Sequence, residues 1–284
     1  MMQKLFLLLA VLGLIAVLAP DANQIQGPEN LPLEEKEAAV SQEIPDESAA
    51  SQEDAVGDSS AAESETAAAI DVNLPVLMYH TSSEETPGTW EELYVKPSEF
   101  EKQVAWLKDS GYTFCTFDDW PNLSQVTKPI LLTFDDGYLE NYTEIYPILE
   151  KYQAKATIFL VAEKTTGLTR DMIREMSGSS LVKFESHTLS HPSLVEISGD
   201  PDRLAAEIGD SKRLIEEITG QTVLALAYPN GEFNQQVKEI TREYYLFGLR
   251  KDLGMHNTAY DDYEVHRIRI NRSTSLDSFI SSIN

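Results

Sequence analysis

The segment ILLTFDDG, from Ile130 to Gly137, joins an apolar run to two adjacent aspartates and a glycine. An apolar run of this kind is typical of a parallel strand that is buried on both faces. Adjacent carboxylates repel each other, and burying either of them without a partner is costly in free energy. Asp-Asp-Gly is also good turn chemistry, so the segment alone leaves a solvated turn and a functional site open.

Strand-like and helix-like segments alternate through residues 70–284, which are sufficient for one large domain. Strands are expected at 75–79, 112–117, 130–134, 156–161, 182–185, 223–228, 245–249 and 265–270. Helices are expected from a capping box at Ser98 and Glu101 to Gly111, and at 139–152, 200–220 and 276–283. This alternation indicates a parallel α/β architecture. Seven or eight such units in about 215 residues favour a closed or nearly closed barrel over an open sheet.

The first 69 residues have a different composition. An apolar run at 5–18 follows Lys4 and is shorter than the roughly 20 residues of a spanning helix. Residues 1–20 are therefore predicted to be a signal peptide or an N-terminal anchor. Residues 21–69 are rich in Glu, Asp, Ser and Ala, lack aromatic residues and contain Lys36 as their only basic residue. This segment is predicted to be a disordered acidic linker, in a chain that is exported to the cell surface or the medium.

The charge and cysteine content narrow the classes of partner. The formal net charge is −25, which argues against nucleic-acid binding because that function needs basic clusters. Cys115 is the only cysteine of the sequence, so no internal disulfide is expected, and its apolar surroundings predict a buried thiol. Contact with a membrane is expected only through the N-terminal segment, and the domain is expected to be a monomer.

Polar residues stand directly after four of the predicted strands. These residues are His80, Asp135 with Asp136, His187 with His191, and the turn 228–231. In a parallel barrel the functional groups lie at the carboxyl ends of the strands, so these residues are expected to share one site.

Two histidines and a carboxylate make the three-ligand set of a catalytic zinc site, with positions left open for water and substrate. His187 and His191 can face the same way if the intervening residues form a helical turn, although Pro192 favours a loop there. Zinc is the expected ion, and cobalt, nickel or manganese would also suit mixed His/Asp ligation. One aspartate would bind the cation and the other would remain free as a base, provided that the chain turns at Gly137.

Four motifs resemble those of the carbohydrate esterase family 4 polysaccharide deacetylases, the NodB-homology domain. They are TFDDG at 133–137, SHTLSH at 186–191, AYPNG at 227–231 and PVLMYH at 75–80. The last motif is similar to the permuted branch that contains exported poly-β-1,6-N-acetylglucosamine deacetylases. The resemblance implies a distorted (β/α) barrel of about seven strands and metal-dependent hydrolysis of N-acetyl groups on an amino-sugar polysaccharide.

The resemblance also implies roles for individual residues. Asp135 would be the general base, and the metal ligands would be Asp136, His187 and His191. His80 would be the general acid, with His266 as its competitor, and the backbone N–H of Asn230 would stabilise the oxyanion. An arginine of a late strand would pair with the base, with Arg267 preferred to Arg269. Aromatic residues that could stack on sugar rings are Trp90, Trp120, Tyr138 and Tyr142, of which Tyr138 adjoins the acidic motif.

Several alternatives remain open at this level. The polymer could be poly-N-acetylglucosamine, peptidoglycan or a chitin-like chain, because all three carry the same reacting group. A metal-dependent esterase acting on O-acetyl groups, as on xylan, and a pseudoenzyme that binds carbohydrate without turnover are the rival functions. The remaining histidine, His256, lies in a polar segment and is expected at the surface.

Overall fold

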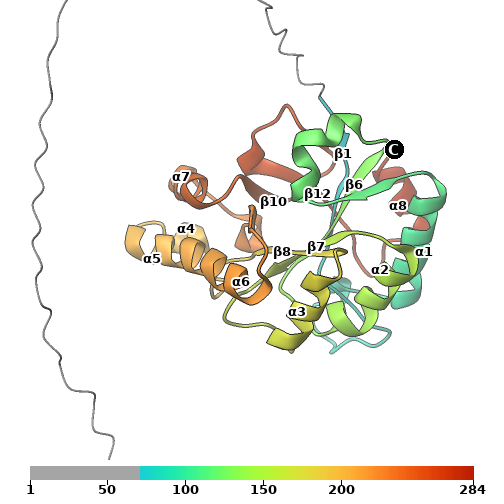
Figure 1. The fold of residues 1–284 in the computed structure, drawn as a ribbon, viewed down its shortest axis with the longest axis horizontal. Helices are drawn as coiled ribbons and strands as arrows, with labels where there is room; N and C mark the ends of the chain where they lie inside the picture. Colours follow the sequence, from blue (N-terminus) through green and yellow to red (C-terminus); the bar gives the residue numbers. More distant parts are fainter. Residues whose placement is uncertain (1–70) are drawn as a thin grey trace, which may run out of the picture. The chain divides into compact units, whose positions relative to one another are not determined.

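The computed structural model describes residues 71–284, apart from the side chain of Asp252 (Figure 1). The predicted signal or anchor segment at 1–20 and the predicted linker at 21–69 lie outside the described residues. Within residues 71–284, none of the helices combines the length and the apolar character that a membrane crossing requires.

Seven parallel strands form a closed barrel. Their order around the barrel is β2 (Val76–Tyr79), β12 (Val265–Arg269), β10 (Phe247–Leu253), β9 (Ala225–Ala227), β8 (Val182–Ser186), β7 (Ala156–Leu160) and β6 (Pro129–Phe134). The barrel closes because β6 also pairs with β2, with Leu131 opposite Val76. An eighth strand, β5 (Thr113–Cys115), pairs with the first half of β6. The expected barrel of about seven strands is confirmed.

Strand β6 shows how the apolar sequence produces this barrel. All six of its residues are buried. Leu131 packs in the cluster inside the barrel, whereas Ile130, Leu132 and Phe134 pack in the cluster that lies under the helices. Side chains of a strand alternate between its two faces. Both faces of β6 are therefore apolar, and the inward face continues from Leu131 through Thr133 to the position of Asp135.

Helices surround the barrel (Figure 1). The longer ones are α1 (Pro97–Asp109), α2 (Tyr146–Tyr152), α3 (Arg170–Gly178), α6 (Ser211–Thr219), α7 (Gln235–Tyr244) and α8 (Leu276–Ser282). The shorter α4 (Leu194–Ile197) and α5 (Pro201–Ala205) precede α6. Helices α3 and α7 were not expected from the sequence, although both begin at a side-chain cap, on Thr169 and Asn234 respectively.

Three details of the expected helices are wrong. The capping box at Ser98 and Glu101 does not form, because Pro97 occupies the first position of α1 and Lys96 is its N-cap. The helix expected at 200–220 begins as predicted, with Asp200 accepting a hydrogen bond from the Arg203 N–H at 3.1 Å. It is interrupted, however, by a π-helical turn, η4 (Ala206–Asp210), between α5 and α6. A similar turn, η3 (Asn141–Ile145), precedes α2 in the segment expected at 139–152.

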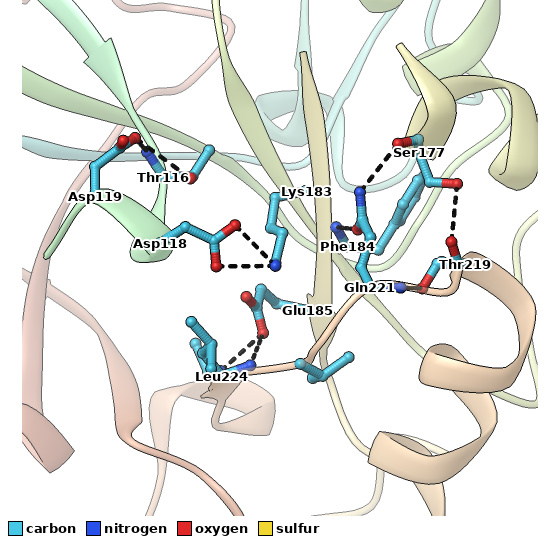
Figure 2. Close-up of polar contacts among 12 residues, drawn as sticks. Thr116, Asp118, Asp119, Ser177, Lys183, Phe184, Glu185, Thr219, Gln221 and Leu224 are labelled. Carbon is cyan, nitrogen blue, oxygen red and sulfur yellow. Dashed lines mark hydrogen bonds and ion pairs between the residues drawn. The ribbon is translucent and has the colours of Figure 1, made fainter. Parts of the chain in front are cut away.

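Charged groups occupy the barrel interior near the amino ends of the strands (Figure 2). Lys183 on β8 donates to both carboxylate oxygens of Asp118 at 2.9 Å, and Asp118 lies on the 3-10 helix η2 (Phe117–Gln125). Glu185, also on β8, accepts from the Leu224 and Ala225 N–H groups at 2.6 and 2.8 Å. Burial raises the pKa of Glu185 to about 8, against the effect of these hydrogen bonds. These groups lie on the same inward face of β8 as His187, which follows the strand.

Candidate active site

One cavity of about 280 Å³ opens at the carboxyl ends of the barrel strands. Most of the candidate site residues named from the sequence line it, and they include His80, Asp135, Asp136, Tyr138, His187, His191, Asn230 and Arg267. They come from segments that follow or include five different strands, so the closure of the barrel is what brings them together.

Asp135 is held by an arginine from across the barrel. It continues the inward face of β6 and is only 3% exposed. Arg267 on β12, which is 1% exposed, donates to its two carboxylate oxygens at 2.7 and 2.8 Å. Burial alone would raise the pKa of Asp135, but the charge of Arg267 and its hydrogen bonds outweigh burial and hold the pKa well below its usual range. Asp135 is therefore an ionised carboxylate in a buried position.

The chain turns between the two aspartates. Asp136 has φ +74° and Gly137 has φ +72°, so two successive residues adopt the left-handed conformation. A side chain at Gly137 would also meet Leu160, because a Cβ built there lies 2.6 Å from Leu160 Cδ2. This turn directs Asp136 toward the two histidines while Asp135 remains with Arg267, which explains why two acids can stand side by side.

Asp136, His187 and His191 form a group that fits a divalent cation. Their ligand atoms all lie within 4.8 Å of one another. Asp136 Oδ1 is 3.5 Å from His187 Nε2 and 3.7 Å from His191 Nε2. His187 Nδ1 lies 2.7 Å from the Ala227 carbonyl oxygen, which it can bond only as a donor, so Nε2 is left as the lone-pair atom facing the other two ligands. Burial, followed by the neighbouring His187, lowers the pKa of His191, which favours the neutral imidazole that a metal requires.

The loop between the two histidines is tied to the π-helical turn η4. Glu207 of this turn accepts from the Ser190 N–H at 2.9 Å and from the Ser190 hydroxyl at 2.6 Å. Its backbone carbonyl accepts from the Leu189 N–H at 3.0 Å. Glu207 is buried, and the loop it holds contains Thr188 and His191 in left-handed conformations. The sequence analysis did not identify Glu207, since the extra residue of a π-turn leaves no mark in a helical pattern.

The structure distinguishes between the two histidines considered for the acid role. His80 lines the cavity, and the charges that act on its pKa include those of Asp135, Asp136 and Arg267. Burial nevertheless lowers the pKa of His80 overall. His266 stands at the amino end of β12, where its ring is 5.8 Å from that of His256 and 5.3 Å from that of Tyr260. It is not among the residues that line the cavity.

The expectation of a surface position for His256 is wrong. The residue is fully buried, since β11 (His256–Asn257) pairs with β1 (Asn73–Leu74). Its ring lies 5.7 Å from that of Trp120, which itself stacks on Phe117. The sheet of β1 and β11 therefore buries His256, although the sequence around this residue is polar.

Two of the four aromatic candidates line the cavity. Trp90 is 79% exposed and has φ +55°, a left-handed conformation that is unusual for a bulky side chain. Tyr138 lines the same cavity, and burial followed by the charge of Asp136 raises the pKa of its hydroxyl. Trp120 packs with Phe117, and Tyr142 donates from its hydroxyl to Glu175 at 2.8 Å, so both belong to other parts of the domain.

Proteins related in sequence are named as polysaccharide deacetylases. A family model described as polysaccharide deacetylase matches residues 122–246. YxkH of Bacillus subtilis, whose name places it among the polysaccharide deacetylases, is 33% identical over 98% of this chain and 97% of its own length. The poly-beta-1,6-N-acetyl-D-glucosamine N-deacetylase of Staphylococcus aureus is 24% identical over 62% of this chain and 67% of its own length.

Solved structures of related proteins have the same fold. BC0361, a polysaccharide deacetylase from Bacillus cereus, has a TM-score of 0.71 at 32% identity, with 75% of this chain and 70% of that chain covered. The Streptococcus pyogenes deacetylase PplD, solved in complex with acetate, has a TM-score of 0.69 at 30% identity, with 76% and 100% covered. The chain therefore belongs to the polysaccharide deacetylase family and has the NodB-type barrel of carbohydrate esterase family 4.

Proposed function

We propose that this chain is a metal-dependent N-deacetylase of an extracellular amino-sugar polysaccharide of the poly-N-acetylglucosamine type. The observation that carries the proposal is one cavity in which an ionised, arginine-bound Asp135 adjoins the ligand group Asp136, His187 and His191. Residues 70–284 would form the catalytic domain. The apolar N-terminal segment supports export, either in a cleaved form or as an anchor.

The cation would be held by Asp136, His187 and His191. A divalent ion in such a site, with zinc as the first candidate, polarises a carbonyl group and acidifies water. Three protein ligands would leave coordination positions for water and substrate, as a catalytic site requires.

Asp135 would accept the proton of the attacking water. Arg267 keeps this carboxylate ionised and fixes its plane, and a carboxylate retains lone pairs for a third hydrogen bond when it accepts two from arginine. The Asn230 N–H would donate to the developing oxyanion, a contribution of about 3–4 kcal/mol for a donor of this kind. Asn230 lines the cavity on the turn η5 (Pro229–Gly231) and has φ +58°.

His80 would donate a proton to the departing amine. Its carbonyl oxygen accepts from Asn141 Nδ2 at 2.9 Å, which fixes the backbone at this position. Burial lowers the pKa of His80 overall, and the nearby carboxylates Asp135 and Asp136 oppose this effect only in part. Trp90 and Tyr138 would contact the sugar rings through their faces.

The substrate class follows from relatives rather than from the cavity. The Staphylococcus aureus relative is named as a deacetylase of poly-beta-1,6-N-acetyl-D-glucosamine, which supports that polymer as the first to test. Peptidoglycan and chitin-like chains carry the same acetamide and belong in the same assay.

The test is acetate release from oligomers of β-1,6-linked N-acetylglucosamine. We expect activity that a chelator abolishes, that zinc or cobalt restores, and that Asp135→Asn reduces at least a hundredfold. Asp171→Asn is the matched control, because Asp171 is an exposed aspartate on α3, away from the cavity. Acetate release that survives both the chelator and Asp135→Asn would refute the mechanism. Purified protein that binds the oligomers and a cation without any turnover would instead indicate a pseudoenzyme.

A further inference from the structure

Two cationic side chains line the same cavity without belonging to the proposed catalytic set. Lys251 comes from β10 and Arg269 from β12, and these two strands are paired neighbours. Both residues lie on the side of the cavity formed by these strands. Trp90 and Leu93 line the cavity from the loop that precedes α1.

The stem of Lys251 is placed by Gly231. A Cβ built at Gly231 would lie 2.7 Å from Lys251 Cγ and 2.8 Å from Lys251 Cβ, so the lysine stem runs directly over this glycine. Gly231 follows Asn230, the proposed oxyanion donor. Lys251 is therefore anchored through its stem beside the reaction centre, while the residue as a whole is exposed.

Neither cation is neutralised by an ion pair among the described side chains. Arg269 donates from Nε to Asn271 Oδ1 at 2.9 Å, and this contact leaves its two terminal nitrogens available. The charge of Arg269 also acts on Glu92, but the Glu92 carboxylate accepts a hydrogen bond from the Ser273 hydroxyl at 2.6 Å and forms no ion pair with Arg269 among the described side chains. Asp135 is taken by Arg267, and Asp136 faces the two histidines.

We propose that Lys251 and Arg269 form a subsite for an anionic substituent, a carboxylate or a phosphate, on the amino-sugar polymer. This inference rests on the proposed deacetylase function and, among the candidate amino-sugar polymers, favours those that carry anionic groups over neutral poly-N-acetylglucosamine. Lysine and arginine side chains that line one cavity can recognise such oxygens through charge-assisted hydrogen bonds, and arginine can do so with two parallel bonds. The chain has a net charge of −25, which repels an anionic polymer. Positive charges at the cavity, here Lys251 and Arg269, would attract such a polymer locally.

The charge of the product leads to the same conclusion. Each N-deacetylation converts a neutral acetamide into an ammonium group, so a neutral homopolymer becomes a polycation as the reaction proceeds. Lys251 and Arg269 would repel that product with increasing strength. A polymer that carries its own anionic groups would still be attracted to Lys251 and Arg269 after many of its acetamides have been converted.

The test measures binding separately from turnover. Dissociation constants are measured with the full chain carrying Asp135→Asn, so that the probes are not consumed. The probes are the neutral N-acetylglucosamine tetramer, a tetrasaccharide with the lactyl carboxylate of N-acetylmuramic acid, and a tetramer bearing a 6-phosphate. We expect both anionic probes, or the one that the subsite fits, to bind at least tenfold more tightly than the neutral tetramer. Their order identifies carboxylate or phosphate as the preferred anion.

Substitutions then assign the preference to the two residues. Lys251→Gln and Arg269→Gln should each reduce the ratio of anionic to neutral affinity about fivefold, and the double variant should abolish it. Lys102→Gln, an exposed charge removal on α1, should leave the ratio unchanged. Equal affinity for neutral and anionic probes in the parent protein, or an undiminished ratio in the double variant, would overturn the proposal. Absence of acetate release from every polymer would refute the deacetylase function alone, since the affinity ratio is independent of turnover.

Discussion

Asp135 and Arg267 form an ion pair with almost no solvent exposure, and this makes the pair sensitive to the loss of either member. Their side chains are 4% and 1% exposed, and Arg267 is also held by the Arg250 carbonyl at 2.9 Å. Removing one partner of a buried pair leaves an uncompensated charge, which costs about 3–5 kcal/mol. We expect Arg267→Met to lower the free energy of unfolding by this amount in chemical denaturation.

A matched set of variants tests this reading of the pair. Arg174→Met removes an arginine from an exposed pair with Asp171 and should change stability by less than about 1 kcal/mol. Combining Arg267→Met with Asp135→Asn should recover part of the lost stability, because no buried charge is then left alone. Additive losses in the double variant would show that Arg267 stabilises the barrel by packing rather than by pairing.

Trp90 gives the second prediction at the scale of a single residue. The side chain is 79% exposed, so Trp90→Ala should leave the denaturation midpoint nearly unchanged. Loss of an aromatic platform at the cavity should instead raise KM about tenfold with little change in kcat, since stacking binds substrate and transition state alike. Trp90→Phe should restore most of the affinity, and Leu246→Ala, another exposed apolar residue, is the control. A fall in kcat at constant KM would exclude the platform role.

The convergence of the candidate site residues on one cavity could be predicted because strand ends carry a clear signal. Asp135 lies two and four residues beyond the inward-facing Thr133 and Leu131, so its direction follows from the alternation of β6. Residues that act on the site from outside the strands gave no comparable signal. Glu207 reaches the histidine loop only because a π-turn adds a residue to the helix, and His256 is buried by pairing with a segment nearly two hundred positions earlier.

At the scale of elements, the turn η4 positions the loop that carries the two histidines proposed as metal ligands. Glu207 holds the Ser190 N–H and hydroxyl with its carboxylate, and Leu189 with its carbonyl. Groups that orient metal ligands typically change metal affinity by about 10–100-fold when they are removed. We expect Glu207→Ala to weaken zinc binding to the apo protein within this range, as measured by titration calorimetry.

The variants around Glu207 separate positioning from folding. Glu207→Gln retains one acceptor oxygen and should show a smaller loss of zinc affinity than Glu207→Ala. Glu217→Gln, an exposed change on the neighbouring α6, should have no effect. If Glu207→Ala binds zinc with the affinity of the parent protein while losing stability, the contact serves the fold and not the ligand loop.

The π-turns that interrupt two helices could not be predicted from the sequence. The pattern at 200–220 predicts one amphipathic helix, and both of its ends are found as expected, at Asp200 and at Gly220 with φ +68°. The extra residue of a π-turn does not change the helical character of a sequence. The turn η4 is therefore recognised only in the structure, where Glu207 contacts the histidine loop. The strands and the closed barrel, in contrast, could be predicted, because continuous apolar runs at regular spacing leave few arrangements other than a parallel barrel.

At the scale of the whole molecule, the barrel has one end that carries the cavity and one end that is covered. The carboxyl ends of the strands carry the cavity, whereas the amino ends are closed by η2, the Lys183–Asp118 pair and the sheet of β1 and β11. His256 belongs to the covered end. A pH low enough to protonate His256 should therefore lower the stability of the domain without a direct effect on the groups of the cavity.

This separation gives a prediction for the pH dependence of stability. Burial lowers the pKa of His256 to about 4, with a smaller contribution from His266, and the ring of Tyr260 also faces it. The unfolded chain protonates this histidine near pH 6.5, so the unfolded state binds more protons between pH 6.5 and 4. The free energy of unfolding should therefore fall as the pH decreases through this interval, by up to about 3 kcal/mol from this residue.

A His256→Gln variant tests whether this residue causes the pH dependence of stability. Chemical denaturation at several pH values should show a shallower fall for His256→Gln than for the parent chain, because the amide side chain does not titrate. Substituting the exposed Tyr260 by Phe, which keeps the neighbouring ring, should leave the slope unchanged. Parallel curves for His256→Gln and the parent protein would mean that other groups produce the acid sensitivity, and that His256 is accessible to protons in the folded barrel.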